Sequence, residues 1–210
     1  AFYELLHTSK ELSVGSIPMM ASYGITDAMM RFEKANPAIR VNVLEADTSD
    51  LIHCLKEGKC EIAFLRDIDH LESGFVSLTF AKDSLAAMLP KTHPLAAQES
   101  LSLTALADEK FVLLKEKTYL YDLCFDSCKK AGFSPNVVYT SHHFENLVTK
   151  KKKDKAVSLV MSGSIPETAG SSVSIVPLQP PVTNRIVLAY VKGRKLSPEA
   201  ALFLRCLPNK

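Results

Sequence analysis

The order of apolar and polar positions predicts an alternation of short strands and helices in the first third of the chain. Apolar residues run or alternate through 12–17, 40–45 and 61–65, which is typical of β-strands. Between them, apolar positions spaced three and four apart predict a helix over 20–35 and a second helix from Leu51 to Gly58. This β-α-β-α-β order predicts a parallel sheet with crossover helices.

A similar alternation fills the second half of the chain. One or two strands are expected over 75–90, at 75–80 and 84–89. The elements expected after them are a short helix at 102–107, strands at 111–114, 137–140, 157–161 and 173–176, a helix from Thr118 to Lys130, and a helix from about Ser141 through Val148. A strand at 185–191 and a helix that begins at Ser197-Pro198 complete the chain. We therefore predict two α/β units, with the second inserted before the final strand and helix.

Length and charge exclude several classes of protein. The 210 residues are enough to bury a core, and 25 basic against 23 acidic residues leave a net charge of +2. A nucleic-acid-binding domain usually carries a clear basic excess, so this balance argues against DNA binding by the chain itself. No apolar run approaches the roughly 20 residues that a membrane helix needs, so we expect no membrane partner.

The five cysteines are odd in number and irregular in spacing, which does not suggest a disulfide framework. A reducing cytoplasm is the simpler location. Cys124 and Cys128 share one face of the predicted helix over that segment. We expect them to be buried structural thiols, with a redox or metal-binding role as the alternative.

Motifs for catalysis and cofactor binding are absent from the sequence. It contains no GxGxxG, GxxxxGK[ST], GxSxG, HExxH or paired CxxC motif. His142-His143 with Glu145 could form a metal or acid–base site, but a polar strand-to-helix turn is the favoured interpretation. The basic run 150–155 is interpreted as a solvated helix end rather than a phosphate or nucleic-acid contact. We expect no catalysis, no cofactor and no metal.

Small hydroxyl residues and one arginine follow several predicted strands. They are Ser16, Thr48 with Ser49, Arg66, residues 140–143 and residues 162–164. Ligands of open parallel α/β sheets bind beyond the carboxyl ends of the strands, and helix N-termini there favour anions. Each residue alone could be an N-cap or a loop residue. Together they predict a site for a small polar or anionic metabolite.

Several short segments stand in a characteristic order and spacing along the chain. These segments are Leu12-Ser13-Val14-Gly15-Ser16, Phe32-Glu33-Lys34-Ala35-Asn36-Pro37, Val41-Asn42-Val43, Leu55-Lys56-Glu57-Gly58, Glu61-Ile62-Ala63-Phe64, Leu89-Pro90-Lys91-Thr92-His93-Pro94-Leu95-Ala96, Ala131-Gly132-Phe133-Ser134-Pro135, Leu196-Ser197-Pro198-Glu199-Ala200 and Phe203-Leu204. With them the chain resembles the effector-binding domain of LysR-type transcriptional regulators over about residues 11–207. The sequence departs from the family pattern at Glu61, where aspartate is common, and at 153–156, where glycines are frequent.

The resemblance implies two Rossmann-like α/β subdomains of the type II periplasmic-binding-protein kind. Two crossover strands, near 80–83 and 181–185, would join them. Residues 11–81 with 184–210 would form subdomain I and residues 82–183 subdomain II. Residues 1–10 would be the remnant of a linker helix, because the family's winged helix-turn-helix domain does not precede residue 1. The chain would then be a fragment of a longer regulator.

The resemblance also implies that a small effector binds between the subdomains and alters how the oligomer binds DNA. Effector contacts are expected from the loop after the first strand, the start of the second helix and the loop after the strand at 137–140. With the two residues taken from the strand-end argument, Arg66 and Ser162, the candidate effector-binding residues are Ser16, Ile17, Met19, Met20, Thr48, Ser49, Arg66, Ser141, His142 and Ser162.

A homodimer or homotetramer is implied as well, with the helix near 50–57 of one copy against the helix near 121–130 of another. DNA would be bound only through the domain that this chain lacks. Two alternatives share the fold: an extracytoplasmic solute-binding protein of a transporter, and an enzyme on the same scaffold, for which we find no signature.

Overall fold

The computed structural model describes residues 10–18, 20–68, 71, 74–141, 143, 146–147, 156–165 and 173–207. Backbone contacts divide the chain into unit 1, residues 1–81 with 185–210, and unit 2, residues 82–184. The boundaries fall inside two long strands, β4 (Phe75–Pro90) and β9 (Thr183–Val191), so the chain passes between the units twice. The expected linker-helix remnant at 1–10 lies, except for Lys10, outside the described residues.

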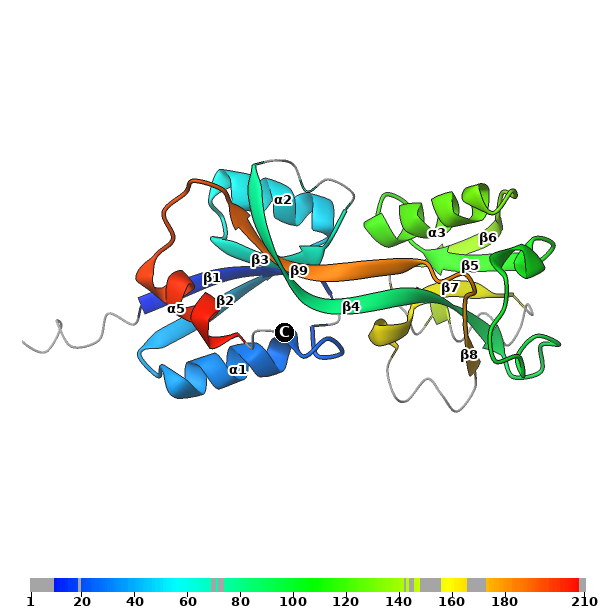
Figure 1. The fold of residues 1–210 in the computed structure, drawn as a ribbon, viewed down its shortest axis with the longest axis horizontal. Helices are drawn as coiled ribbons and strands as arrows, with labels where there is room; N and C mark the ends of the chain where they lie inside the picture. Colours follow the sequence, from blue (N-terminus) through cyan, green and yellow to red (C-terminus); the bar gives the residue numbers. More distant parts are fainter. Residues whose placement is uncertain are drawn as a thin grey trace, which may run out of the picture. The chain divides into compact units, whose positions relative to one another are not determined.

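Unit 1 is built on a parallel sheet, as the β-α-β-α-β order predicts (Figure 1). β1 (Lys10–Ser16) lies between β2 (Ile39–Glu45) and β3 (Ile62–Arg66) and runs parallel to both. β9 then adds to the other side of β3 in the antiparallel direction. All three parallel strands therefore end at one edge of the sheet.

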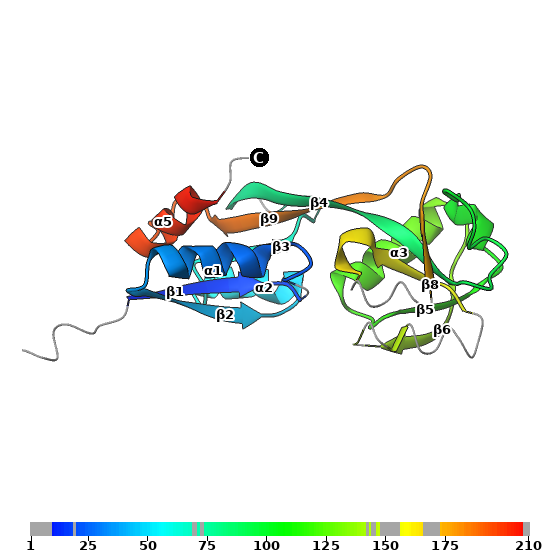
Figure 2. The same cartoon turned by 90° about the horizontal axis from the view of Figure 1, so that it is seen from below.

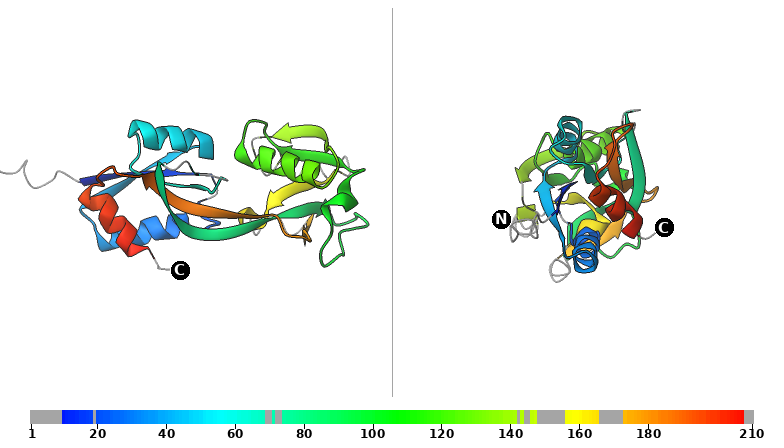
Figure 3. Two further views of the ribbon diagram at one scale, coloured as in Figure 1. Left: turned by 45° about the horizontal axis from the view of Figure 1, so that its top comes forward. Right: turned by 90° about the vertical axis from the view of Figure 1, so that its left-hand side faces the viewer.

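Helices cover both faces of this sheet (Figure 3). α1 (Ile25–Ala35) and α5 (Pro198–Cys206) lie side by side on one face, where the rings of Phe32 and Phe203 meet edge to face with centroids 5.0 Å apart. α2 (Thr48–Glu57) lies on the opposite face. Because helices cover β3 from both sides, all five of its residues are buried.

Gly15 in β1 allows α2 to approach the sheet closely. A Cβ atom at this position would lie 2.8 Å from Cδ2 of Leu51 in α2 and 2.9 Å from Cβ of Ala63 in β3. Both distances are shorter than ordinary van der Waals contact. The absence of a side chain at Gly15 therefore sets the position of the second crossover helix against the strand ends.

The first helix begins later than its apolar spacing predicts. Residues 20–24 form a turn, closed by the hydrogen bond from the Ile25 N–H to the Met20 carbonyl at 2.9 Å, and α1 starts only at Ile25. The predicted start at residue 20 is therefore wrong. Gly24 has a φ of 75°, a left-handed conformation that the helix cannot include.

Unit 2 combines a parallel strand pair with antiparallel additions. β5 (Lys110–Leu114) runs parallel to β6 (Asn136–Ser141), with α3 (Tyr119–Lys130) as the crossover between them. The second half of β4 pairs in the antiparallel direction with β7 (Ser158–Met161) and β8 (Val173–Pro177). The Val112 N–H donates to the Val157 carbonyl at 2.8 Å, which brings β5 beside the start of β7.

Alternate residues of these strands face two separate cores. Leu85, Phe111 and Leu159 pack with Cys124 and Cys128 of α3 in one cluster. The residues between them in the strands face a second cluster, formed by Met88, Val112, Leu147, Ala156, Val160 and Val173. The period-two alternation of a strand thus gives unit 2 apolar layers on both faces of its sheet.

Residues 75–90 form one continuous strand, which is one of the two predicted alternatives for that segment. Two other expected elements of unit 2 differ from the structure. The short helix at 102–107 is a single 3₁₀ turn, η2 (Leu103–Leu106). Ser141 is the last residue of β6, whereas the sequence predicted that a helix begins there. Parallel pairing with Leu114 of β5 extends the strand to this residue. Most of the helix predicted to follow it lies outside the described residues.

Candidate functional site

The carboxyl ends of β1, β2 and β3 bring six predicted site residues to one edge of unit 1. They are Ser16 and Ile17 after β1, Met20 in the following turn, Thr48 and Ser49 at the start of α2, and Arg66 at the end of β3. The two remaining candidates with described positions, Ser141 and Ser162, belong to unit 2. Met19 and His142 lie outside the described residues.

The residues that end β1 are engaged within the protein. Ser16 is buried, and its hydroxyl donates to the carbonyl of Ile17 at 3.1 Å. The Ile17 N–H donates to the Phe64 carbonyl at 3.0 Å, and its side chain packs in the core of unit 1. Met20 packs against the same core and is half-buried. The residues at this strand end are therefore packed into unit 1 beneath the edge formed by the strand ends.

The two hydroxyl residues that begin α2 differ in their surroundings. Thr48 is 1% exposed, and its Oγ1 accepts the Arg66 backbone N–H at 3.2 Å, which ties the end of β3 to the start of α2. Ser49 is exposed. The N-cap residue Asp47 makes no side-chain capping hydrogen bond to the helix. The first N–H groups of α2 therefore have no intrahelical acceptor and no capping side chain from Asp47.

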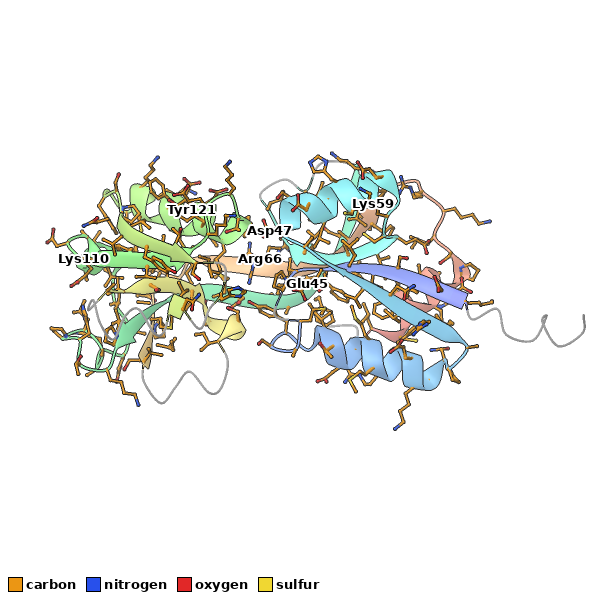
Figure 4. The ribbon with its side chains drawn as sticks, turned by 180° about the vertical axis from the view of Figure 1, so that it is seen from behind. Glu45, Asp47, Lys59, Arg66, Lys110 and Tyr121 are labelled. Carbon is orange, nitrogen blue, oxygen red and sulfur yellow. The ribbon has the colours of Figure 1, made fainter. Side chains whose placement is uncertain are left out.

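Arg66 is the only charged residue among the six predicted site residues at this edge, and it is 7% exposed. Its Nη2 donates to the Tyr23 hydroxyl at 2.7 Å, and its guanidinium carbon lies 5.4 Å from the centre of the Tyr23 ring. Its Nη1 is buried and has no hydrogen-bond partner among the described residues. Figure 4 shows Arg66 at the same end of unit 1 as Asp47, the N-cap of α2.

No described carboxylate forms an ion pair with Arg66. Two acidic residues are nearby in the chain: Glu45 is exposed at the end of β2, and Asp47 is half-buried before α2 (Figure 4). Buried charges in proteins are usually paired with an opposite charge or bound to a ligand. An arginine of this kind at a set of strand ends is therefore suited to binding an anion.

In unit 2 the candidate serines hold loops in place. Ser141 is buried, and its Oγ accepts the His143 N–H at 3.1 Å and the Asn146 Nδ2 at 2.9 Å. Ser162 is exposed, but its hydroxyl donates to Oδ1 of Asp83 at 2.8 Å. These hydroxyls organise the residues that follow β6 and β7.

Two residues of these networks were missed by sequence reasoning. Tyr23 falls within the segment predicted as helix, and the left-handed Gly24 that follows it was the available signal for a turn. Asp83 is 7% exposed in β4 and accepts hydrogen bonds from the N–H groups of Ser84 and Gly163 as well as from Ser162. No local pattern around Asp83 marks it as a hydrogen-bonding centre.

The cysteine pair on α3 is buried, as predicted. Cys124 is 1% exposed and Cys128 is fully buried. Burial raises the pKa of the Cys128 thiol to about 12, so this thiol stays protonated and unreactive near neutral pH. The described residues contain no group of three His, Cys, Asp or Glu side chains placed to hold a metal ion. His142, Glu145 and the basic run 150–155 lie outside them.

Comparison with known proteins agrees with this architecture. The family model of the LysR substrate-binding domain matches residues 7–210. The transcriptional dual regulator GltC of Bacillus subtilis is 24% identical over 190 residues, which cover 90% of this chain and 63% of that protein. The chain therefore spans less than two thirds of the length of this relative. No described helix is long and apolar enough to cross a membrane.

Solved structures show the same fold. The C-terminal domain of a probable LysR family regulator from Rhodococcus sp. RHA1 superimposes with a TM-score of 0.84 at 23% identity, covering 95% of this chain and 99% of that one. The effector-binding domain of QuiR in complex with shikimate gives 0.80 at 20% identity, covering 95% and 96%. The fold is thus the two-subdomain, type II periplasmic-binding-protein architecture, and the matches favour the regulator family over a transporter's solute-binding protein. The chain belongs to the LysR substrate-binding domain family.

Proposed function

We propose that this chain is the effector-sensing part of a transcription regulator and that a small polar molecule binds at the carboxyl ends of β1, β2 and β3. The observation that carries the proposal is the convergence of donors at this edge. The first N–H groups of α2, the exposed Ser49 and the buried Arg66 all belong to neighbouring strand ends. The complex of QuiR with shikimate supports a small-molecule ligand for this fold.

The effector would act by favouring one conformation over another. A ligand shifts a conformational equilibrium only by the difference between its affinities for the two states. A hundredfold preference corresponds to about 2.7 kcal/mol. In the whole protein this energy would change DNA binding by a domain outside this chain, and the work would be done in the cytoplasm without catalysis.

A thermal-shift screen against several hundred metabolites tests the sensing role. A binder at a hundredfold excess over its Kd stabilises the chain by about 2.7 kcal/mol, which gives a measurable rise in Tm. Ser49→Trp places a bulky ring at the start of α2 and should abolish the shift. Ser77→Trp, at an exposed position in β4, is the matched control and should retain it. A screen without binders, or a shift that survives Ser49→Trp, would contradict this site.

Two further measurements address the whole protein and the alternatives. The effector from the screen should change the affinity of the full-length protein for its operator DNA. Absence of that change would argue against regulation, and turnover of the bound compound would argue for an enzyme.

Self-association is a separate proposal that rests on exposed strand edges. β2 and β6 are edge strands within the described sheets (Figure 2). They expose Val43, Val138 and Tyr139, each by more than a third. Apolar side chains on an open edge favour pairing with another chain. We infer a homodimer that buries these edges, with the neighbouring helices α2 and α3 as further candidates for contact.

Sedimentation tests the dimer. Val138→Lys should give a folded monomer, because the residue is 46% exposed in the single chain, and its Tm should no longer rise with protein concentration. Leu78→Lys on β4, also 46% exposed, is the control and should leave the dimer intact. A wild-type monomer at high concentration would exclude the dimer.

A further inference from the structure

The Nη1 group of Arg66 is an unexplained feature of the candidate site. The residue is 7% exposed, Nη1 is buried, and no described residue accepts its hydrogens. The neighbouring Nη2 group already donates to the Tyr23 hydroxyl. A buried charged donor without an acceptor is destabilising, and natural proteins keep such groups rarely. Retention of this arrangement needs a reason.

Tyr23 holds the guanidinium in place while Nη1 stays without a described acceptor. The phenol accepts one hydrogen bond at 2.7 Å, and the ring lies against the guanidinium with 5.4 Å between the ring centre and the guanidinium carbon. Ring and cation attract each other, which partly offsets the cost of burying the charge. Tyr23 follows β1, whereas Arg66 ends β3, so the arginine side chain reaches across to the connection after the neighbouring strand. Tyr23 thus acts as a positioning residue for Arg66.

The start of α2 supplies further donors next to the backbone of Arg66. The Arg66 N–H donates to Oγ1 of Thr48, the first residue of this ten-residue helix. The Asp47 side chain does not cap the helix, so its first-turn N–H groups and the positive end of its dipole can contribute to anion binding. The helix N-terminus and the buried arginine are independent features that favour the same kind of ligand.

We propose that the effector carries a carboxylate that pairs with Arg66 Nη1 near the start of α2. This inference rests on the proposed sensing function and adds the chemical class of the ligand. A carboxylate matches the planar donor geometry of a guanidinium and supplies the missing opposite charge. Because Nη1 is enclosed in the ligand-free chain, the groups that cover it must shift before a ligand can reach it. Binding at this atom is therefore coupled to a rearrangement, as a sensor requires.

Matched pairs of acid and amide provide the test. The probes are benzoate with benzamide, nicotinate with nicotinamide and succinate with succinamide, titrated calorimetrically into the wild-type chain and into Arg66→Met. Each amide keeps the shape of its acid but has no negative charge. In the wild type, the best-bound acid should be favoured over its amide by about a hundredfold, the usual effect of a charge-assisted hydrogen bond to a buried group. In Arg66→Met this preference should fall to about threefold or less.

The melting temperature of the ligand-free chain separates a ligand-binding arginine from a structural one. Arg66→Met removes an unpaired buried charge, keeps the backbone bond to Thr48 and should leave Tm unchanged or raised. A structural arginine would lower it. Arg66→Lys keeps the charge without the planar geometry and should lose at least tenfold in acid affinity.

Several results would overturn the inference. Equal binding of acid and amide, a preference that survives in Arg66→Met, or no acid binding in the panel would do so. If the metabolite screen yields only neutral binders that depend on Ser49, the carboxylate is excluded while the sensing function stands. A screen without any binder overturns both.

Discussion

Units 1 and 2 each contain a buried charge near their candidate residues, and the two charges are satisfied differently. Asp83 in unit 2 accepts hydrogen bonds from Ser84, Ser162 and Gly163. The Nη2 group of Arg66 in unit 1 donates to the Tyr23 hydroxyl, whereas its Nη1 has no acceptor among the described residues. A charge whose hydrogen bonds are made by the chain itself stabilises the fold. A charged group that still has a hydrogen-bond donor without an acceptor is better suited to binding a ligand.

The largest expected effect is the loss of the Asp83 carboxylate. Asp83→Ala leaves the Ser84 and Gly163 N–H groups and the Ser162 hydroxyl without this acceptor and should lower the free energy of unfolding by about 3 kcal/mol. Urea unfolding measures the change. Ser162→Ala removes one of the three bonds and should cost about 1 kcal/mol. If Asp83→Ala and Arg66→Met had equal effects on stability, the contrast between the units would be wrong.

The next effect concerns the position of α2, which carries the donors of unit 1. Gly15→Ala places a methyl group 2.8 Å from Leu51 and 2.9 Å from Ala63, and should destabilise the chain by about 2 kcal/mol through overpacking. Gly74→Ala is the matched control, because nothing lies within 4 Å of its Cβ position and its φ is not left-handed. A thermal melt of both variants decides whether the close approach is needed, since equal Tm values would show that it is not.

A smaller difference in stability is expected between variants of two candidate serines, Ser141 and Ser49. Ser141→Ala should cost about 1 kcal/mol, because the His143 N–H and the Asn146 amide lose a buried acceptor. Ser49→Ala should change stability by less than about 0.5 kcal/mol, since Ser49 is exposed. Chemical denaturation compares the two. A larger loss of stability for Ser49→Ala than for Ser141→Ala would contradict the distinction between a structural hydroxyl at Ser141 and an unengaged, exposed one at Ser49.

The smallest perturbation is chemical modification of the thiols. With a pKa of about 12, only roughly one Cys128 thiol in ten thousand is ionised at pH 8, so iodoacetamide should not alkylate it in the folded chain. Raising the pH towards 12 increases the thiolate fraction and hence the rate. Exposed Cys206 on α5 is the internal control and should react at pH 8. Mass spectrometry of peptides measures the extent of alkylation at both cysteines. Rapid labelling of Cys128 would contradict its inertness and support a redox role for the thiols of α3.

The amino-acid sequence by itself determined the order of the elements and the residues at their ends. The apolar run of β3, Gly58 after α2 and the Ser197-Pro198 start of α5 are local signals, because burial on both faces, left-handed caps and N-caps involve residues close together in the chain. The same logic selected Thr48, Ser49 and Arg66 as strand-end residues. It failed at residues 20–24, where helical spacing concealed a turn.

Only the tertiary structure decided which polar groups are satisfied. Thr48 accepts from a backbone N–H 18 positions away, Arg66 meets Tyr23 across 43 positions, and Asp83 meets Ser162 across 79. Hydrogen bonds require heavy atoms within about 3.2 Å, and the sequence pattern does not specify distances between segments so far apart. Local sequence patterns thus identify the donor residues, whereas packing decides which partners they meet. Packing also leaves the Nη1 of Arg66 without an acceptor among the described residues.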